Sequence, residues 1–158
     1  LYSGARETFD DHGVTLAHLG TSTYVGVDAR QACLYDLALL GLWYEAELAY
    51  FNALTLVGAP DTDPEPFVPF ARRQFGHVVD ALPEVAKEVR DRRYPAGPAS
   101  LVEHARVLDQ LMEVRCAAGM DTTYVGAVRD AVRRLIDNGA GAHGFTRLAE
   151  EVRPHGRA

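Results

Sequence analysis

Residues 34–44 read LYDLALLGLWY, an almost unbroken apolar run that contains a single charged residue, an aspartate. Asp28 followed three residues later by Gln31 is a pattern typical of a helix N-terminus, and Gly58 is the next strong C-terminal stop. The sequence therefore predicts one long helix over residues 28–57. At about 1.5 Å per residue such a helix would be roughly 43 Å long.

The first half of this predicted helix is apolar on nearly every side. A helix that is hydrophobic all round has to be covered by other elements or by another subunit. We therefore expect a homodimer whose interface uses this helix and the helices after it. An obligate interface of this kind buries more than roughly 2,000 Å² in total.

The aspartate in the apolar run, Asp36, is the first candidate for chemistry. An ionised carboxylate in apolar surroundings is costly, so it usually has a partner, a raised pKa or a place in a cleft. At about 100° per residue, Trp43 lies roughly 20° from the azimuth of Asp36, and Tyr44 lies roughly 80° away. One helix could thus line a cleft with an acid, an indole and a phenol. The alternatives are an Asp36 paired with an arginine of a neighbouring helix and aromatic rings that belong to the core.

The sequence before the long helix differs from the rest. Residues 1–4 and 21–26 are short β-branched or aromatic runs closed by glycine, which is typical of strands. Residues 7–19 between them can form a helix with Gly20 as its stop. We interpret residues 1–27 as the strand–helix–strand remnant of an α/β sheet whose remainder lies upstream.

The sequence after the long helix predicts a bundle of shorter helices, so the fold class is mainly α. Their expected positions are residues 67–94 with a kink or a new start at Pro83, Ser100 to Gly119 with a capping box to Glu103, Asp121 or Thr122 to Asn138, and residues 143–152.

Composition restricts the classes of function. The 158 residues are 47% apolar and 24% charged, which suits one domain with a core, or one domain plus a fragment of another. A net charge of -6 argues against a nucleic-acid partner, and no apolar run reaches the length of a membrane span. We expect a cytoplasmic protein in which Cys33 and Cys116 are small buried hydrophobic residues rather than a disulfide.

Two motifs that could suggest a bound ion or nucleotide are interpreted structurally. Residues 139–144 match G-x-G-x-x-G, but a helix rather than a strand precedes them, so we expect a helix end and a turn. The acidic loop at residues 59–66 lacks the glycine and the late glutamate of a calcium loop. The histidines show no ligand pair at metal spacing, so we predict no metal site.

Residues 34–40 resemble the inter-domain helix of the NADPH-dependent imine reductases and reductive aminases, within the 6-phosphogluconate and β-hydroxyacid dehydrogenase superfamily. Residues 1–4 and 23–26 look like the last Rossmann strands of these enzymes. Residues 117–121 and 141–145 are similar to parts of their C-terminal helical domain. The resemblance covers essentially the whole chain and implies a Rossmann remnant over residues 1–27 and a helical dimerisation and substrate domain over residues 28–158.

The resemblance also implies an activity and a site. Hydride would pass from NADPH to the C=N bond of an imine, and the substrate would be either an imine or a carbonyl compound plus an amine. Asp36 would be the proton donor or anchor at the nitrogen, and Tyr44 would border the substrate. Gln74 stands where many members carry tryptophan, and Leu108-Asp109 replaces a Met-Gln or Met-Glu pair. The expected lining of the substrate pocket is Leu40, Trp43, Gln74, Leu108 and Asp109.

NADPH would be bound mainly by the N-terminal Rossmann domain, whose phosphate-binding glycines are not in this chain, so the chain alone is expected to be inactive. Two alternatives remain. A β-hydroxyacid dehydrogenase of this layout would place a lysine on the long helix, whereas the only lysine here is Lys87. The second alternative is a helical dimerisation module without catalysis, and a parent reading frame that encodes a Rossmann domain upstream of Leu1 would argue against it.

Overall fold

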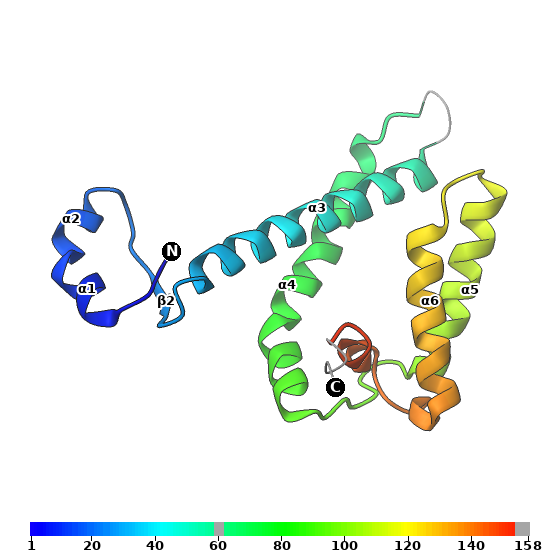
Figure 1. Cartoon of the computed structure of the whole chain (residues 1–158). Helices are drawn as coiled ribbons and strands as arrows, with labels where there is room; N and C mark the ends of the chain where they lie inside the picture. Colours follow the sequence, from blue (N-terminus) through cyan, green and yellow to red (C-terminus); the bar gives the residue numbers. More distant parts are fainter. Residues whose placement is uncertain (59–61, 154–158) are drawn as a thin grey trace. The chain divides into compact units, whose positions relative to one another are not determined.

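The computed structural model describes residues 1–58 and 62–153, so part of the acidic loop at residues 59–66 lies outside the described residues (Figure 1). The chain folds as two compact units, Leu1–Val57 (unit 1) and Gly58–Ala158 (unit 2). Helices dominate both units, and the mainly α class predicted from the sequence is confirmed.

Unit 1 begins with a two-stranded parallel sheet. Its elements are β1 (Tyr2–Ser3), α1 (Arg6–Asp11), α2 (Gly13–Ala17) and β2 (Tyr24–Gly26). The aromatic ring of Phe9 on α1 packs against Tyr2 and Tyr24, with ring centroids 5.8 and 5.3 Å away. The prediction of one helix over residues 7–19 is wrong, because the helix breaks at His12 (φ -98°, ψ 5°). The next residue, Gly13, favours the break, since glycine is a poor residue for a helix interior.

The long helix α3 spans Gln31–Val57 and begins later than predicted. The prediction that Asp28 caps the helix together with Gln31 is wrong. The Asp28 carboxylate instead accepts hydrogen bonds from the backbone N–H of Arg30 at 2.9 Å and from the Arg30 guanidinium at 2.8 Å. The first turn of α3 is instead capped by Ser3 of β1, whose Oγ accepts from the backbone N–H of Ala32 at 3.0 Å. The two-stranded sheet therefore fixes the start of α3.

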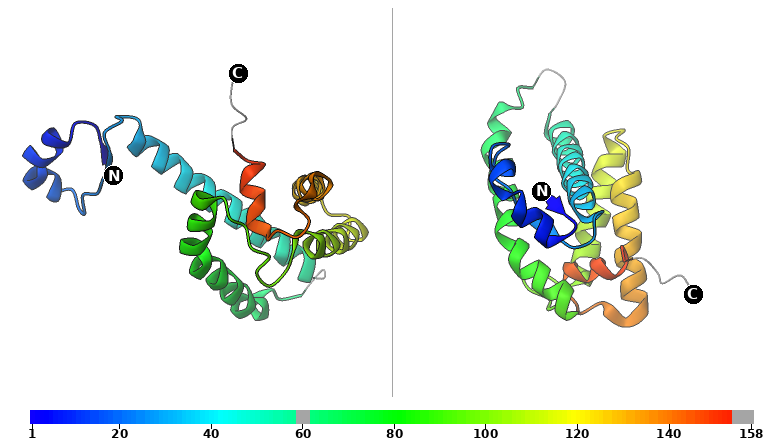
Figure 2. Two further views of the ribbon diagram at one scale, coloured as in Figure 1. Left: turned by 90° about the horizontal axis from the view of Figure 1, so that it is seen from below. Right: turned by 60° about the vertical axis from the view of Figure 1, so that its left-hand side comes forward.

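Unit 2 is a set of helices around a small core. They are η1 (Glu65–Phe67), α4 (Val68–Asp91), α5 (Leu101–Ala117), α6 (Thr123–Leu135), η2 (Ile136–Ala140) and η3 (Phe145–Glu150). Helices α5 and α6 lie side by side (Figures 1 and 2), and the core cluster consists of Leu101, Val132, Leu135 and Ala140. Helix α4 continues through Pro83 without a new start.

The capping box predicted at the start of α5 is confirmed. The carboxylate of Glu103 accepts from the backbone N–H of Ser100 at 2.7 Å and from its hydroxyl at 2.9 Å. The glycine-rich turn supplies two further caps, because the carbonyls of Gly141 and His143 accept from the first amides of α5. A Cβ atom on Gly144 would collide with the backbone oxygen of Pro95, so this position requires glycine. The turn thus binds the protein's own amides.

Both cysteines are free and exposed in the single chain, so the prediction that they are buried is wrong. Cys33 lies on α3 and Cys116 at the end of α5. Among the described residues, no helix combines the length and the apolar character needed to cross a membrane.

Candidate active site

The candidate acid and its neighbours occupy successive turns of α3, which is drawn as one continuous helix in Figure 1. Asp36, Leu40 and Trp43 share a face, because residues three and four apart lie on the same side of an α-helix. Asp36 was expected in apolar burial, but within the single chain its side chain is exposed. It makes no ion pair and no side-chain hydrogen bond among the described residues. Among the described residues, Asp36 therefore lacks the arginine partner that a purely structural role would require.

The two aromatic residues beside the acid contact each other. The ring centroids of Trp43 and Tyr44 are 5.0 Å apart, and the ring planes are inclined by 59°. This geometry falls in the range of favourable tilted aromatic pairs. Trp43 is 53% exposed and Tyr44 63% exposed, so the fold of one chain does not bury them as core residues.

The charge on α3 has one sign. Between Gln31 and Val57 the charged side chains are Asp36, Glu45 and Glu47, with no lysine, arginine or histidine. A carboxylate flanked by aromatic rings attracts an organic cation through Coulomb and cation–π forces. The face of α3 that carries Asp36 is therefore suited to a cationic nitrogen.

The other three predicted pocket residues lie in unit 2. Gln74, on α4, is exposed and lines a surface groove. Leu108 of α5 packs against the core cluster of unit 2. Asp109 accepts two hydrogen bonds from Arg133 of α6, at 2.7 and 2.9 Å. Leu108 and Asp109 thus have structural contacts that were not foreseen from the sequence.

The groove beside Gln74 was not predicted from the sequence. His104 of α5 contacts Phe145 of η3 on one side of it, with ring centroids 4.9 Å apart and ring planes inclined by 52°. Its apolar wall is a stripe on α4 at helical spacing, which consists of Val78, Ala81, Leu82 and Val85. That spacing is the signal in the sequence that could have identified the groove.

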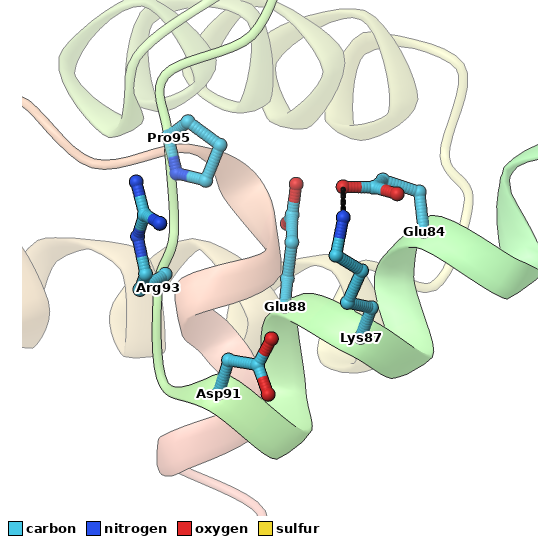
Figure 3. A pocket seen from close by; sticks show the side chains of 6 residues that line it. All are labelled: Glu84, Lys87, Glu88, Asp91, Arg93 and Pro95. Carbon is cyan, nitrogen blue, oxygen red and sulfur yellow. Dashed lines mark hydrogen bonds and ion pairs between the residues drawn. The ribbon is translucent and has the colours of Figure 1, made fainter.

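A second hollow of unit 2 is charged (Figure 3). Its lining consists of Glu84, Lys87, Glu88, Asp91, Arg93 and Pro95. Lys87 donates to Glu84 at 3.4 Å, and the hydroxyl of Thr146 donates to Glu88 at 2.5 Å. The hydrogen bonds from Arg90 hold the pKa of Asp91 below its usual value.

Lys87, which is the only lysine of the chain, lies in this surface ion pair on α4 and not on α3. No cluster of three or more metal-ligating side chains occurs among the residues described.

The sequence pattern of a known domain family, described as NADPH-dependent reductive aminase-like, C-terminal domain, matches residues 28–154. The chain belongs to this family. The matched range contains α3 with Asp36 and all the helices of unit 2. The family resemblance inferred from the sequence is confirmed.

Named relatives of the family agree with this result. An NADPH-dependent reductive aminase from Aspergillus oryzae is 23% identical over 154 residues, which cover 95% of this chain and 52% of that protein. The structure of an imine reductase from Bacillus cereus matches with a TM-score of 0.86 at 26% identity, over 94% of this chain and 52% of the other. A reductive aminase from Aspergillus terreus, solved with NADPH and ethyl-5-oxohexanoate, matches with a TM-score of 0.85 at 26% identity, over 96% and 53%. The chain spans about half the length of these relatives.

Proposed function

We propose that this chain is the C-terminal helical part of an oxidoreductase that reduces the C=N bond of imines with hydride from NADPH. The observation that carries the proposal is the exposed Asp36 on the same face as Trp43 of α3, a helix whose charged side chains are all acidic, in a chain of the reductive aminase-like family. The substrate class is an imine, or a carbonyl compound with an amine. Related structures with such compounds support it, among them the Aspergillus terreus enzyme with cyclohexanone and allyl amine.

The residues of this chain act on the nitrogen end of the substrate. Asp36 donates a proton to the nitrogen or, when ionised, anchors the protonated nitrogen through its own negative charge. Tyr44 borders the substrate, and its contact with Trp43 restricts both rings. Leu40, Gln74, Leu108 and Asp109 complete the proposed pocket lining.

NADPH, when bound, supplies the hydride that adds to the carbon of the C=N bond. The glycine-rich turn of this chain does not fit its phosphates, because it is closed against α5 by its own hydrogen bonds. We propose that an N-terminal Rossmann domain holds the cofactor and that residues 1–27 are its end. The start of the family match at residue 28 supports this boundary. On this proposal the chain alone does not turn over.

The active site is proposed to form between two copies of the protein. Large apolar side chains stay exposed along α3, namely Leu34, Tyr35, Leu37, Leu39, Leu40, Leu42, Trp43, Tyr44, Leu48, Phe51 and Val57. Exposure on this scale exceeds what a monomer normally leaves in water. A second copy that covers α3 would remove it and would also enclose the face that carries Asp36.

The test is Asp36→Ala in the full-length protein. General acid catalysis contributes about 10²–10⁴-fold, so kcat for imine reduction should fall by that range. The melting temperature should hold or rise, because a charge is removed from a face that the dimer covers.

The matched control is Glu45→Ala, which removes an acid from the same helix at an azimuth roughly 180° from Asp36. It should leave kcat close to that of the wild type. Unchanged turnover in Asp36→Ala together with a lowered melting temperature would assign Asp36 a structural role and refute the proposal.

A further inference from the structure

A small pocket of unit 2 is lined almost entirely by basic and aromatic side chains. Its lining consists of Arg92, Arg93, Tyr94, Pro95, His143 and Arg147, and we name it the arginine pocket. The residues come from three segments, namely the connection after α4, the turn after η2, and η3. We propose that the arginine pocket binds a phosphate group. This goes beyond the proposed function and does not rest on it.

Arg147 is positioned in the pocket by an aromatic ring. Its guanidinium lies over the ring of Tyr94, with Cζ 5.2 Å from the ring centroid, and Tyr94 is only 4% exposed. The Nε atom of Arg147 is buried without a hydrogen-bond partner among the described residues. Because the Nε atom is enclosed by the protein, the groups of Arg147 that can reach an anion are its terminal Nη N–H groups.

Arg92 adopts a backbone conformation that glycine would adopt more easily. It ends α4 in the left-handed region, with φ 51° and ψ 39°. Glycine is the preferred residue at such a helix end, because a side chain adds steric strain. Arg92 is 68% exposed at its side chain and approaches Glu150 only at 3.8 Å. The exposed Arg92 guanidinium thus makes one long ion pair among the described residues.

The acids near the pocket are already engaged. Glu150 accepts a hydrogen bond from Tyr94 and forms an ion pair with Arg153 at 3.5 Å. Asp91 pairs with its neighbour Arg90. The carboxylate of Glu88, which lines the hollow next to the pocket, accepts from the hydroxyl of Thr146.

Two of the arginines make no direct ion pair among the described residues, although Arg93 interacts at longer range with Asp91 and Arg147 with Glu150. Arg93 also lines the acidic hollow of Figure 3. The exposed imidazole of His143 adds a further donor. Positive charge is therefore concentrated here in a chain whose net charge is -6. Guanidinium groups match the geometry of phosphate oxygens and bind them through paired N–H groups.

Calorimetric titration of the full 158-residue chain with inorganic phosphate tests the proposal, at pH 7 and an ionic strength held constant with chloride. We expect one saturable site per chain. Arg147→Gln and Arg93→Gln should each weaken the affinity about tenfold, the effect of losing one charge-assisted hydrogen bond. Arg72→Gln is the matched control, since Arg72 is an exposed arginine of α4 outside the pocket.

A second titration, with adenosine monophosphate, distinguishes the source of the phosphate. Tighter binding than that of inorganic phosphate assigns the pocket to an organic phosphomonoester, and equal binding assigns it to free phosphate. Lost binding in Arg93→Gln is not explained by misfolding, because the exposed Arg93 side chain makes no ion pair among the described residues. Absence of saturable binding, or equal affinity in wild type, Arg147→Gln and Arg93→Gln, would overturn the proposal.

Discussion

Individual residues of the candidate site were easier to identify than their contacts. Asp36, Trp43 and Tyr44 could be placed on one helix from the sequence alone, because helical periodicity fixes their azimuths. The partner of Asp109 could not, since Arg133 lies 24 residues away on another helix. The arginine pocket was missed for the same reason, because its residues come from separate connections that no periodic pattern relates.

Glu150 gives a prediction about acid stability at the residue scale. The hydrogen bond from Tyr94, helped by nearby arginines, lowers the pKa of the Glu150 carboxyl in the folded state. A lowered pKa stabilises the fold above the unfolded value of about 4.3, and this stability is lost as the pH falls through the folded pKa. Glu150→Gln should therefore reduce the free energy of unfolding at pH 7, and the difference from wild type should shrink at pH 3.

Urea unfolding at both pH values measures this effect. The control is Glu84→Gln, whose exposed carboxylate contacts only Lys87 at 3.4 Å among the described residues and should change stability little at either pH. A difference between Glu150→Gln and wild type that is the same at pH 7 and pH 3 would contradict the explanation.

Elements follow from sequence where their determinants are local. The capping box of α5 lies within four consecutive residues and was predicted, whereas the cap of α3 joins Ser3 to Ala32 across 29 positions and was not. The break at His12 was missed because the apolar spacing of residues 7–19 suits a single helix. Long-range hydrogen bonds and packing thus decided the points on which the sequence-based expectations were wrong.

The cap of α3 can be tested directly. Ser3→Ala removes the acceptor for the Ala32 amide and should reduce stability by about 1 kcal/mol, as expected for the loss of a cap. Hydrogen exchange should become faster in the first turn of α3. Ser22→Ala is the matched control, because the Ser22 hydroxyl is buried without a hydrogen-bond partner among the described residues. Equal exchange of the α3 amides in wild type and Ser3→Ala would show that the cap does not matter.

At the scale of the whole molecule, the apolar surface of α3 is the feature that one chain does not explain. Unit 2 has a core of its own, yet α3 has no buried residue along its 27 positions. The sequence predicted this imbalance, because an all-round apolar helix is recognisable from composition alone. In the proposed dimer, the covering of α3 depends on a partner surface, which periodicity cannot specify.

The dimer is therefore the prediction on which the interpretation of α3 depends. Light scattering at micromolar concentration should give twice the mass of the 17.3 kDa chain, because an obligate interface of more than roughly 2,000 Å² does not dissociate readily. Leu42→Glu places a charge on α3 away from the face of Asp36 and should abolish the dimer, since a buried unpaired charge is costly. Val14→Glu, on the exposed helix α2, should leave the dimer intact. A stable monomer in the wild type would mean that the exposed side chains of α3 tolerate water, and the active site would then have to form within one chain.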